Sequence, residues 1–152
     1  MPEIETPLSP NAELMLRSRQ STWHFIDKCV ITLDQTDKWQ PIKPFPTAKP
    51  YLPWVVEKIV SDPLVAVVKH RRMVITWAAC AIALWDAMFH EGRFVALMSK
   101  KEEDSDELVR RCKFIYDNIP PASLPVKPKI EVKFTQIRFP EIDSTIKGFA
   151  QG

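Results

Sequence analysis

The stretch VAVVKHRRMVITW, from Val65 to Trp77, decides how the fold is read. A short apolar, β-rich run leads into basic residues and then into a helical pattern, which is the layout of a phosphate-binding strand, loop and helix. In an α/β sheet such a loop lies at the carboxyl edge, beside the positive end of a helix, where anions bind. The loop contains no glycine, although glycine normally supplies the positive φ that a phosphate loop needs.

The elements on either side predict an α/β fold. Leu64–Val68 and Phe94–Met98 are continuous apolar runs typical of buried strands. A nearly all-apolar helix is expected over Thr76–His90 and an amphipathic helix over Lys101–Asn118. Strand, helix, strand and helix in this order predict a right-handed parallel unit flanked by helices. After residue 130 the polarity alternates, which predicts a β-hairpin-like C-terminal segment.

The second predicted helix has a candidate start signal in Ser99 and Glu102, which have the S-x-x-E spacing of a capping box. Earlier in the chain, residues 1–22 are expected to form a flexible tail, and the segment that follows fits either a short helix or a strand. Five prolines between Pro41 and Pro53 predict a stiff, extended loop. A short helix is expected from Trp54 to Ser61.

The composition is that of a globular chain. Hydrophobic residues make up 45% and charged residues 26%, which argues against wholesale disorder. The net charge of +2 permits a nucleic-acid partner without implying one. The three scattered cysteines predict reduced thiols and no zinc site. The uncharged run from Met73 to Trp85 is shorter than the roughly 20 residues that span a bilayer, so no membrane segment is expected.

Four residues of the basic loop are candidates for an anion site. Lys69, Arg71 and Arg72 supply fixed positive charge, and Thr76 offers a hydroxyl where phosphate loops place a magnesium ligand. The competing interpretation is a solvated basic turn over a core helix. The two readings stay open on composition alone.

Several stretches taken together resemble the amino-terminal part of the ATPase domain of phage terminase large subunits, the motors that pump viral DNA into capsids. The resemblance runs from Phe25 to the last residue, and SKKEED followed by FIYDNIP is its most distinctive combination. The matching stretches are FIDKCVITLD, PIKPFPTAKPYL, VKHRRMVITW, ALWDAMFHEGR, SKKEEDSDELVRRCKFIYDNIP and FPEIDSTIKGFAQG.

The resemblance implies a partial P-loop NTPase-type sheet, with the phosphate site at residues 64–90, and a role for each loop residue. In a subset of this family the lysine stands at the front of the phosphate loop, as Lys69 does. By this likeness Lys69 contacts the β- and γ-phosphates of ATP and Thr76 holds Mg²⁺. Arg71 matches a loop arginine proposed to assist cleavage of the γ-phosphate, which makes it the candidate catalytic residue.

Further ATP contacts implied by the resemblance are Tyr51 and Phe45, in the region that covers adenine, and Arg72, at the phosphates. Tyr51 and Phe45 are explained as well by packing in the core, and Arg72 by a solvated charge. The Lys101–Asn118 helix is expected to serve as scaffold.

The family's Asp-Glu strand, which holds magnesium and orients water, has no counterpart in this sequence, and neither does the nuclease domain. Residues 23–152 are therefore expected to form an incomplete ATPase domain of a truncated terminase, with weak or absent hydrolysis and with exposed sheet edges. The resemblance implies double-stranded viral DNA, the portal protein and the small terminase subunit as partners, a homo-oligomeric ring, and the cytoplasm of the infected bacterial host. The alternatives are an inert remnant or a non-enzymatic nucleic-acid-binding or assembly fragment using KHRR, Lys127, Lys129, Lys133 and Arg138.

Overall fold

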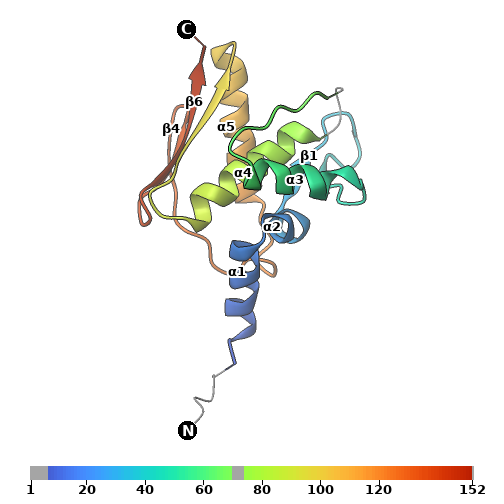
Figure 1. Ribbon diagram of the computed structural model, residues 1–152, viewed down its shortest axis with the longest axis vertical. Helices are drawn as coiled ribbons and strands as arrows, with labels where there is room; N and C mark the ends of the chain where they lie inside the picture. The colour runs from blue at the N-terminus through green and yellow to red at the C-terminus, as the bar shows by residue number, and fades with distance from the viewer. Residues whose placement is uncertain (1–6, 70–73, 152) are drawn as a thin grey trace.

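The computed structural model of the chain describes residues 7–69 and 74–151 (Figure 1). Its main sheet has four strands in the order β3-β6-β5-β4. These strands are β3 (Phe94–Ser99), β4 (Glu131–Lys133), β5 (Gln136–Phe139) and β6 (Ser144–Ala150). Helices α4 (Ile75–Phe89) and α5 (Glu102–Asp117) lie on one side of this sheet (Figure 1). The predicted α/β class is confirmed, but the sheet is mixed instead of parallel.

Strand β6 is the centre of the sheet's pairing. It runs parallel to β3, with Phe94 opposite Thr145, and antiparallel to β5, which pairs antiparallel with β4. The predicted hairpin-like C-terminal segment is therefore confirmed. Because side chains alternate along a strand, every second residue faces the helices, and Ile137, Phe139 and Ile146 are fully buried there.

The two long helices follow the sequence prediction closely. Helix α4 is apolar nearly all round because it is enclosed by α2, α3, α5 and the sheet. Helix α5 has an acidic first turn, which suits the positive end of a helix, and a buried stripe that includes Cys112 and Ile115. The predicted capping box is wrong, since Ser99 ends β3 and Lys101 precedes α5 with no side-chain cap.

Helix α5 lies directly on β6 at Gly148. A Cβ at that position would come within 3.1 Å of the Ser105 carbonyl oxygen and of the Val109 side chain. The absence of a side chain at Gly148 therefore sets how closely the helix approaches the sheet.

The remaining elements pack on α4, on α5 and on one another: α1 contacts α2, and strand β1 of the small sheet contacts α5. Two of the helices, α2 and α3, contact α4. Strands β1 and β2 pair antiparallel in a separate two-stranded sheet. These elements are α1 (Pro10–Gln20), α2 (Thr22–Cys29), β1 (Ile31–Leu33), β2 (Ile42–Pro44) and α3 (Tyr51–Ser61).

The prediction of a flexible tail over residues 1–22 is wrong for α1. Proline at the first helical position is compatible with a helix start, and the Ser9 side chain accepts a hydrogen bond from the Ala12 N–H. The Trp85 Nε1–H donates to the Ser18 carbonyl over 2.8 Å, which ties the end of α1 to α4. The proline-rich stretch also holds more structure than predicted, because it contains β2 and the start of α3.

The predicted buried strand at Leu64–Val68 is wrong. The segment is extended, but it joins neither sheet, and Leu64 and Val68 are 92% and 101% exposed. An apolar β-rich run favours extended backbone, but the run alone does not specify the strand that would pair with it. The strand-helix-strand unit expected around α4 is therefore not formed by the described residues.

One face of the main sheet and both of its edge strands, β3 and β4, are open within residues 7–69 and 74–151. The side chains of β3 alternate, so that Phe94 and Met98, 62% and 65% exposed, lie on the face away from the helices. Strand β3 pairs on one side only, with β6. The predicted burial of this strand is therefore wrong, whereas the expected open edge with apolar surface is present.

Candidate functional site

A cavity of about 580 Å³ lies where the start of α4, the middle of α5 and the turn after β1 come together. That size is within the range of small-molecule sites, which is roughly 300–1,000 Å³. Its floor is partly aromatic, from Trp77 and Phe114, whose rings meet edge to face at 5.9 Å. The other lining residues are Leu33, Asp34, Gln35, Thr36, Lys69, Val74, Thr76, Glu107, Arg110 and Arg111.

The amino end of α4 opens onto this cavity, and no side chain of the described residues is recorded as capping it. Val74, the residue before the helix, makes no side-chain hydrogen bond to it, and the first turn contains no acidic residue. The N–H groups of a first helical turn have no partner within the helix, and they attract anions. Val74 adopts a left-handed φ of 63°, the conformation for which phosphate loops use glycine.

The cavity is lined by more positive than negative side chains. Lys69, Arg110 and Arg111 contribute three cations, whereas Asp34 and Glu107 contribute two carboxylates. Both carboxylates have cationic partners. Glu107 lies 3.5 Å from the Nε atoms of both arginines, and Asp34 lies 3.2 Å from the Nζ of Lys43.

Asp34 is also held by the turn that carries it. Its Oδ1 accepts hydrogen bonds from the hydroxyl and the backbone N–H of Thr36, at 2.6 and 3.0 Å. These bonds, followed by the Lys43 contact, lower the pKa of Asp34 below its ordinary value. Asp34 is therefore ionised, and its charge is paired with that of Lys43, which does not line the cavity.

Arg111 is the more buried of the two α5 arginines. Its guanidinium carbon lies 5.1 Å from the centre of the Trp77 ring, and its side chain is 29% exposed, compared with 70% for Arg110. A cation over an indole face is attracted to the ring's negative surface. Trp77 and Glu107 thus hold the Arg111 guanidinium at the cavity wall.

Of the predicted site residues, the structure brings Lys69 and Thr76 to this one cavity. Lys69 is exposed and Thr76 lies in the first turn of α4. Arg71 and Arg72 lie outside the described residues. The predicted roles of all four stay predictions.

The two predicted adenine contacts lie elsewhere. Tyr51 lines a second cavity, of about 550 Å³, together with residues of the 64–68 segment and Ile75, so the two cavities share the start of α4. Phe45 is 4% exposed and packs edge to face against Trp23. The position of Phe45 corresponds to the core explanation, and it lines neither of these cavities.

The sequence analysis missed the contribution of α5, which it treated as scaffold. Glu107, Arg110 and Arg111 have the i, i+3 and i, i+4 spacing that pairs charges on one helix face. That spacing was a usable signal for the charge cluster. It carried no information that this face meets Trp77 of α4.

The described residues do not form a magnesium site by themselves. They contain no group of three or more His, Cys, Asp or Glu side chains placed to hold a metal ion. Thr76 is the hydroxyl ligand suggested by the sequence, but the carboxylates of the same cavity are engaged by cations. The three cysteines are free and buried, as predicted.

No helix within residues 7–69 and 74–151 combines the length and the apolar character needed to cross a lipid bilayer. A scan against models of known protein families finds no match for this chain, and no curated protein matches it. The described residues therefore define an α/β protein in which the start of α4 lines a basic, partly aromatic cavity.

Proposed function

We propose that this chain is the ATP-binding portion of a viral terminase large subunit, the ATPase that powers packaging of DNA into a capsid. One observation carries the proposal: Lys69 and Thr76, the two residues that the terminase resemblance assigns to phosphate and magnesium, line the same cavity at the uncapped start of α4. The two residues flank one short loop, and the helix start between them attracts anions.

In this proposal the phosphates of ATP lie against the first turn of α4 and the Lys69 ammonium. Charge-assisted hydrogen bonds to phosphate are among the strongest that a protein makes. The adenine occupies the neighbouring cavity, where Tyr51, Trp54 and Val55 offer apolar surface. Arg71 and Arg72 keep the phosphate roles that the resemblance implies.

The proposal extends to the whole motor only by resemblance. In the complete protein Mg²⁺-dependent ATP hydrolysis drives double-stranded viral DNA through the portal, with a small terminase subunit as partner, a homo-oligomeric ring as the working form, and the infected host's cytoplasm as the location. For this chain alone we expect nucleotide binding with weak or absent hydrolysis, because the described residues complete no magnesium site.

Equilibrium binding of a fluorescent ATP analogue tests the proposal. Lys69→Ala and Thr76→Ala should each weaken binding, the lysine by about 10- to 100-fold, because a charged hydrogen bond is lost. Thr76→Ser keeps the hydroxyl and should bind as the unaltered chain does. Lys133→Ala is the matched control, since Lys133 is exposed on β4. Equal effects of Lys69→Ala and Lys133→Ala, or no binding by the unaltered chain, would contradict the proposal.

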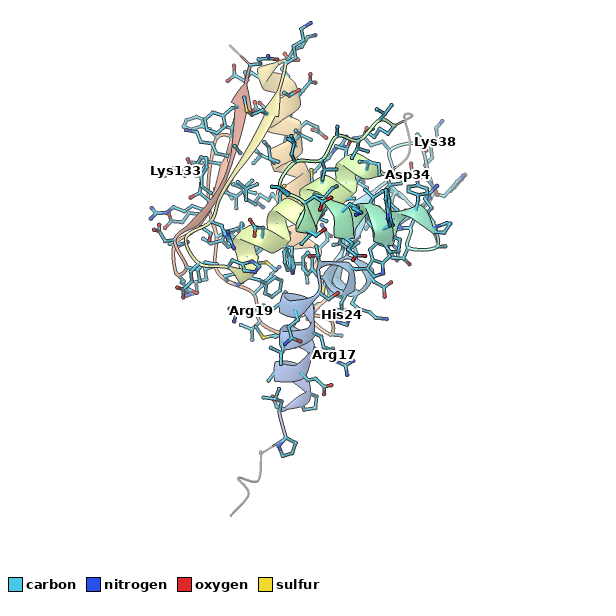
Figure 2. All side chains as sticks on the ribbon, viewed as in Figure 1. Arg17, Arg19, His24, Asp34, Lys38 and Lys133 are labelled. Atoms are coloured by element: carbon cyan, nitrogen blue, oxygen red, sulfur yellow. The ribbon has the colours of Figure 1, made fainter. Side chains whose placement is uncertain are left out.

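A second candidate function is nucleic-acid binding, and the open face of the sheet favours it. Strand register puts Lys133, Gln136 and Lys147 in one row on that face, with Arg138 beside them. Figure 2 shows Lys133 on the side of the sheet away from the helices. Lys127, in contrast, is engaged, since its Nζ donates to the Tyr116 carbonyl over 2.7 Å.

The two functions separate in one titration. DNA binding that falls steeply with salt, is weakened by Lys133→Ala and does not respond to nucleotide would favour the second function, because released counterions dominate such binding. Nucleotide binding that depends on Lys69 and ignores Lys133 would favour the first.

A further inference from the structure

Helix α5 brings two arginines to the cavity, and one carboxylate contacts both. The Glu107 Oε1 lies 3.5 Å from the Arg111 Nε, and its Oε2 lies 3.5 Å from the Arg110 Nε. Each contact joins a single nitrogen to a single oxygen at long range. It is therefore weaker than the two-pronged contact that an arginine makes with a carboxylate or a phosphate.

The Arg111 guanidinium is pre-positioned by a group other than Glu107. Trp77 presents its ring at 5.1 Å, and Trp77 is itself fixed by the edge-to-face contact with Phe114. Arg111 would thus stay over the indole if the Glu107 contact were lost. An arginine held over an aromatic face keeps its N–H groups free for an anion in the plane of the guanidinium.

We propose that Arg111 is a phosphate contact for the nucleotide bound by Lys69 and Thr76, and that Glu107 is a positioning residue which holds the arginines until phosphate replaces it. This inference rests on the proposed function and deepens it, by adding a wall of the site that belongs to α5. When phosphate binds, the Arg111 guanidinium gives up its long contact with Glu107 and makes charge-assisted hydrogen bonds to the phosphate.

The concave shape favours a nucleotide over a nucleic-acid strand as the source of that phosphate. The cavity is about 580 Å³ and is lined in part by Trp77 and Phe114, so its size suits a compact ligand better than a continuous backbone. Two cations from different elements, Lys69 from the loop and Arg111 from α5, line this one cavity and suit a chain of phosphates.

The two residues have opposite predicted effects, which makes the test sharp. Arg111→Ala should weaken binding of ATP and of inorganic tripolyphosphate by about 10- to 100-fold, and should leave adenosine binding unchanged. Glu107→Gln should strengthen binding of both anions by about two- to fivefold, because the competing negative charge is gone. A gain of affinity cannot result from a variant that fails to fold.

Isothermal titration of the full chain with ATP, tripolyphosphate and adenosine provides the measurement. Lys113 and Asp117 form an equivalent i, i+4 ion pair on the same helix, outside the cavity lining. Lys113→Ala and Asp117→Asn are therefore matched controls, and neither should alter anion affinity.

The outcomes of this titration test the Arg111 contact separately from the proposed ATP-binding function. If the chain binds ATP but Arg111→Ala and Glu107→Gln change nothing, the inference is overturned and the proposed function stands. If tripolyphosphate binds with dependence on Arg111 but ATP does not, the anion site stands and the nucleotide assignment is overturned. If a single-stranded oligonucleotide alone shows the Arg111 dependence, the inference is overturned in favour of a nucleic-acid backbone.

Discussion

The left-handed backbone at Val74 gives a direct test of the turn that precedes α4. A residue with a Cβ adopts such a φ, here 63°, at a cost of about 1–2 kcal/mol. Replacing Val74 with glycine or with alanine removes its two partly buried γ-methyl groups in either case, so that loss is common to the two variants, which differ by the Cβ alone. The difference in unfolding free energy between the variants isolates the backbone.

Glycine escapes the left-handed cost, but it loses about 0.5–1 kcal/mol more conformational entropy on folding than alanine. The balance predicts that Val74→Gly is more stable than Val74→Ala by about 0.5–1 kcal/mol. At an ordinary negative φ the order reverses, and alanine is the more stable by about 0.5–1 kcal/mol. The sign of the difference therefore reports the conformation.

Urea unfolding followed by circular dichroism gives both free energies. Ala79 is exposed within the same helix, so Ala79→Gly serves as the control and should cost about 1 kcal/mol. A Val74→Ala variant more stable than Val74→Gly would refute the left-handed turn, and with it the account of how a loop without glycine turns into α4.

Three further predictions concern the rest of the fold. Ser144→Ala should lower the free energy of unfolding in urea by about 1–3 kcal/mol, because the buried hydroxyl donates to the His90 carbonyl over 2.7 Å and accepts from the Arg93 N–H over 3.2 Å. Ser61→Ala, at an exposed site, is the control and should change the free energy of unfolding little. All three cysteines are at most 1% exposed, so a thiol reagent should titrate none in the native chain and three in urea; rapid native labelling would contradict their burial. Hydrogen bonds from Lys43 and from two backbone N–H groups lower the pKa of Asp37 from 3.8 to about 2, so its stabilisation is present above 3.8 and is lost as the pH falls toward 2. Asp37→Asn should therefore lose less stability over that interval in acid-unfolding curves than the unaltered chain, and parallel curves would contradict the ion pair.

The best-predicted elements are those whose hydrophobic pattern indicates both the type of element and the side that it buries. The all-apolar run of α4 and the apolar stripe of α5 each specify a helix and the side that it buries, and both helices agree with prediction to within two residues at either end. The alternation after residue 130 specified strands with one solvated face in the same way.

Prediction failed where an element forms only if another segment packs or pairs with it, because a local pattern does not identify that segment. Leu64–Val68 is apolar and β-rich, but no described strand pairs with it, so it remains an exposed extended segment. The segment predicted as a flexible tail contains Pro10, which stands at a helix start, where its missing N–H costs nothing.

The candidate site was predictable only in part. The motif identified Lys69 and Thr76, which share a cavity. Arg111 was not predicted because its position over Trp77, 34 residues earlier in the sequence, arises from the packing of α5 on α4. Spacing along one helix gives no information about a contact with another helix.

The central claim is that the cavity between the start of α4 and the middle of α5 holds the phosphates of a nucleotide. A crystal structure of the chain with a non-hydrolysable ATP analogue tests it most directly. The account predicts phosphate oxygens within hydrogen-bond distance of the Lys69 Nζ, the first-turn N–H groups of α4 and the Arg111 guanidinium. Nucleotide bound elsewhere, with the cavity empty and Arg111 still paired to Glu107, would contradict it.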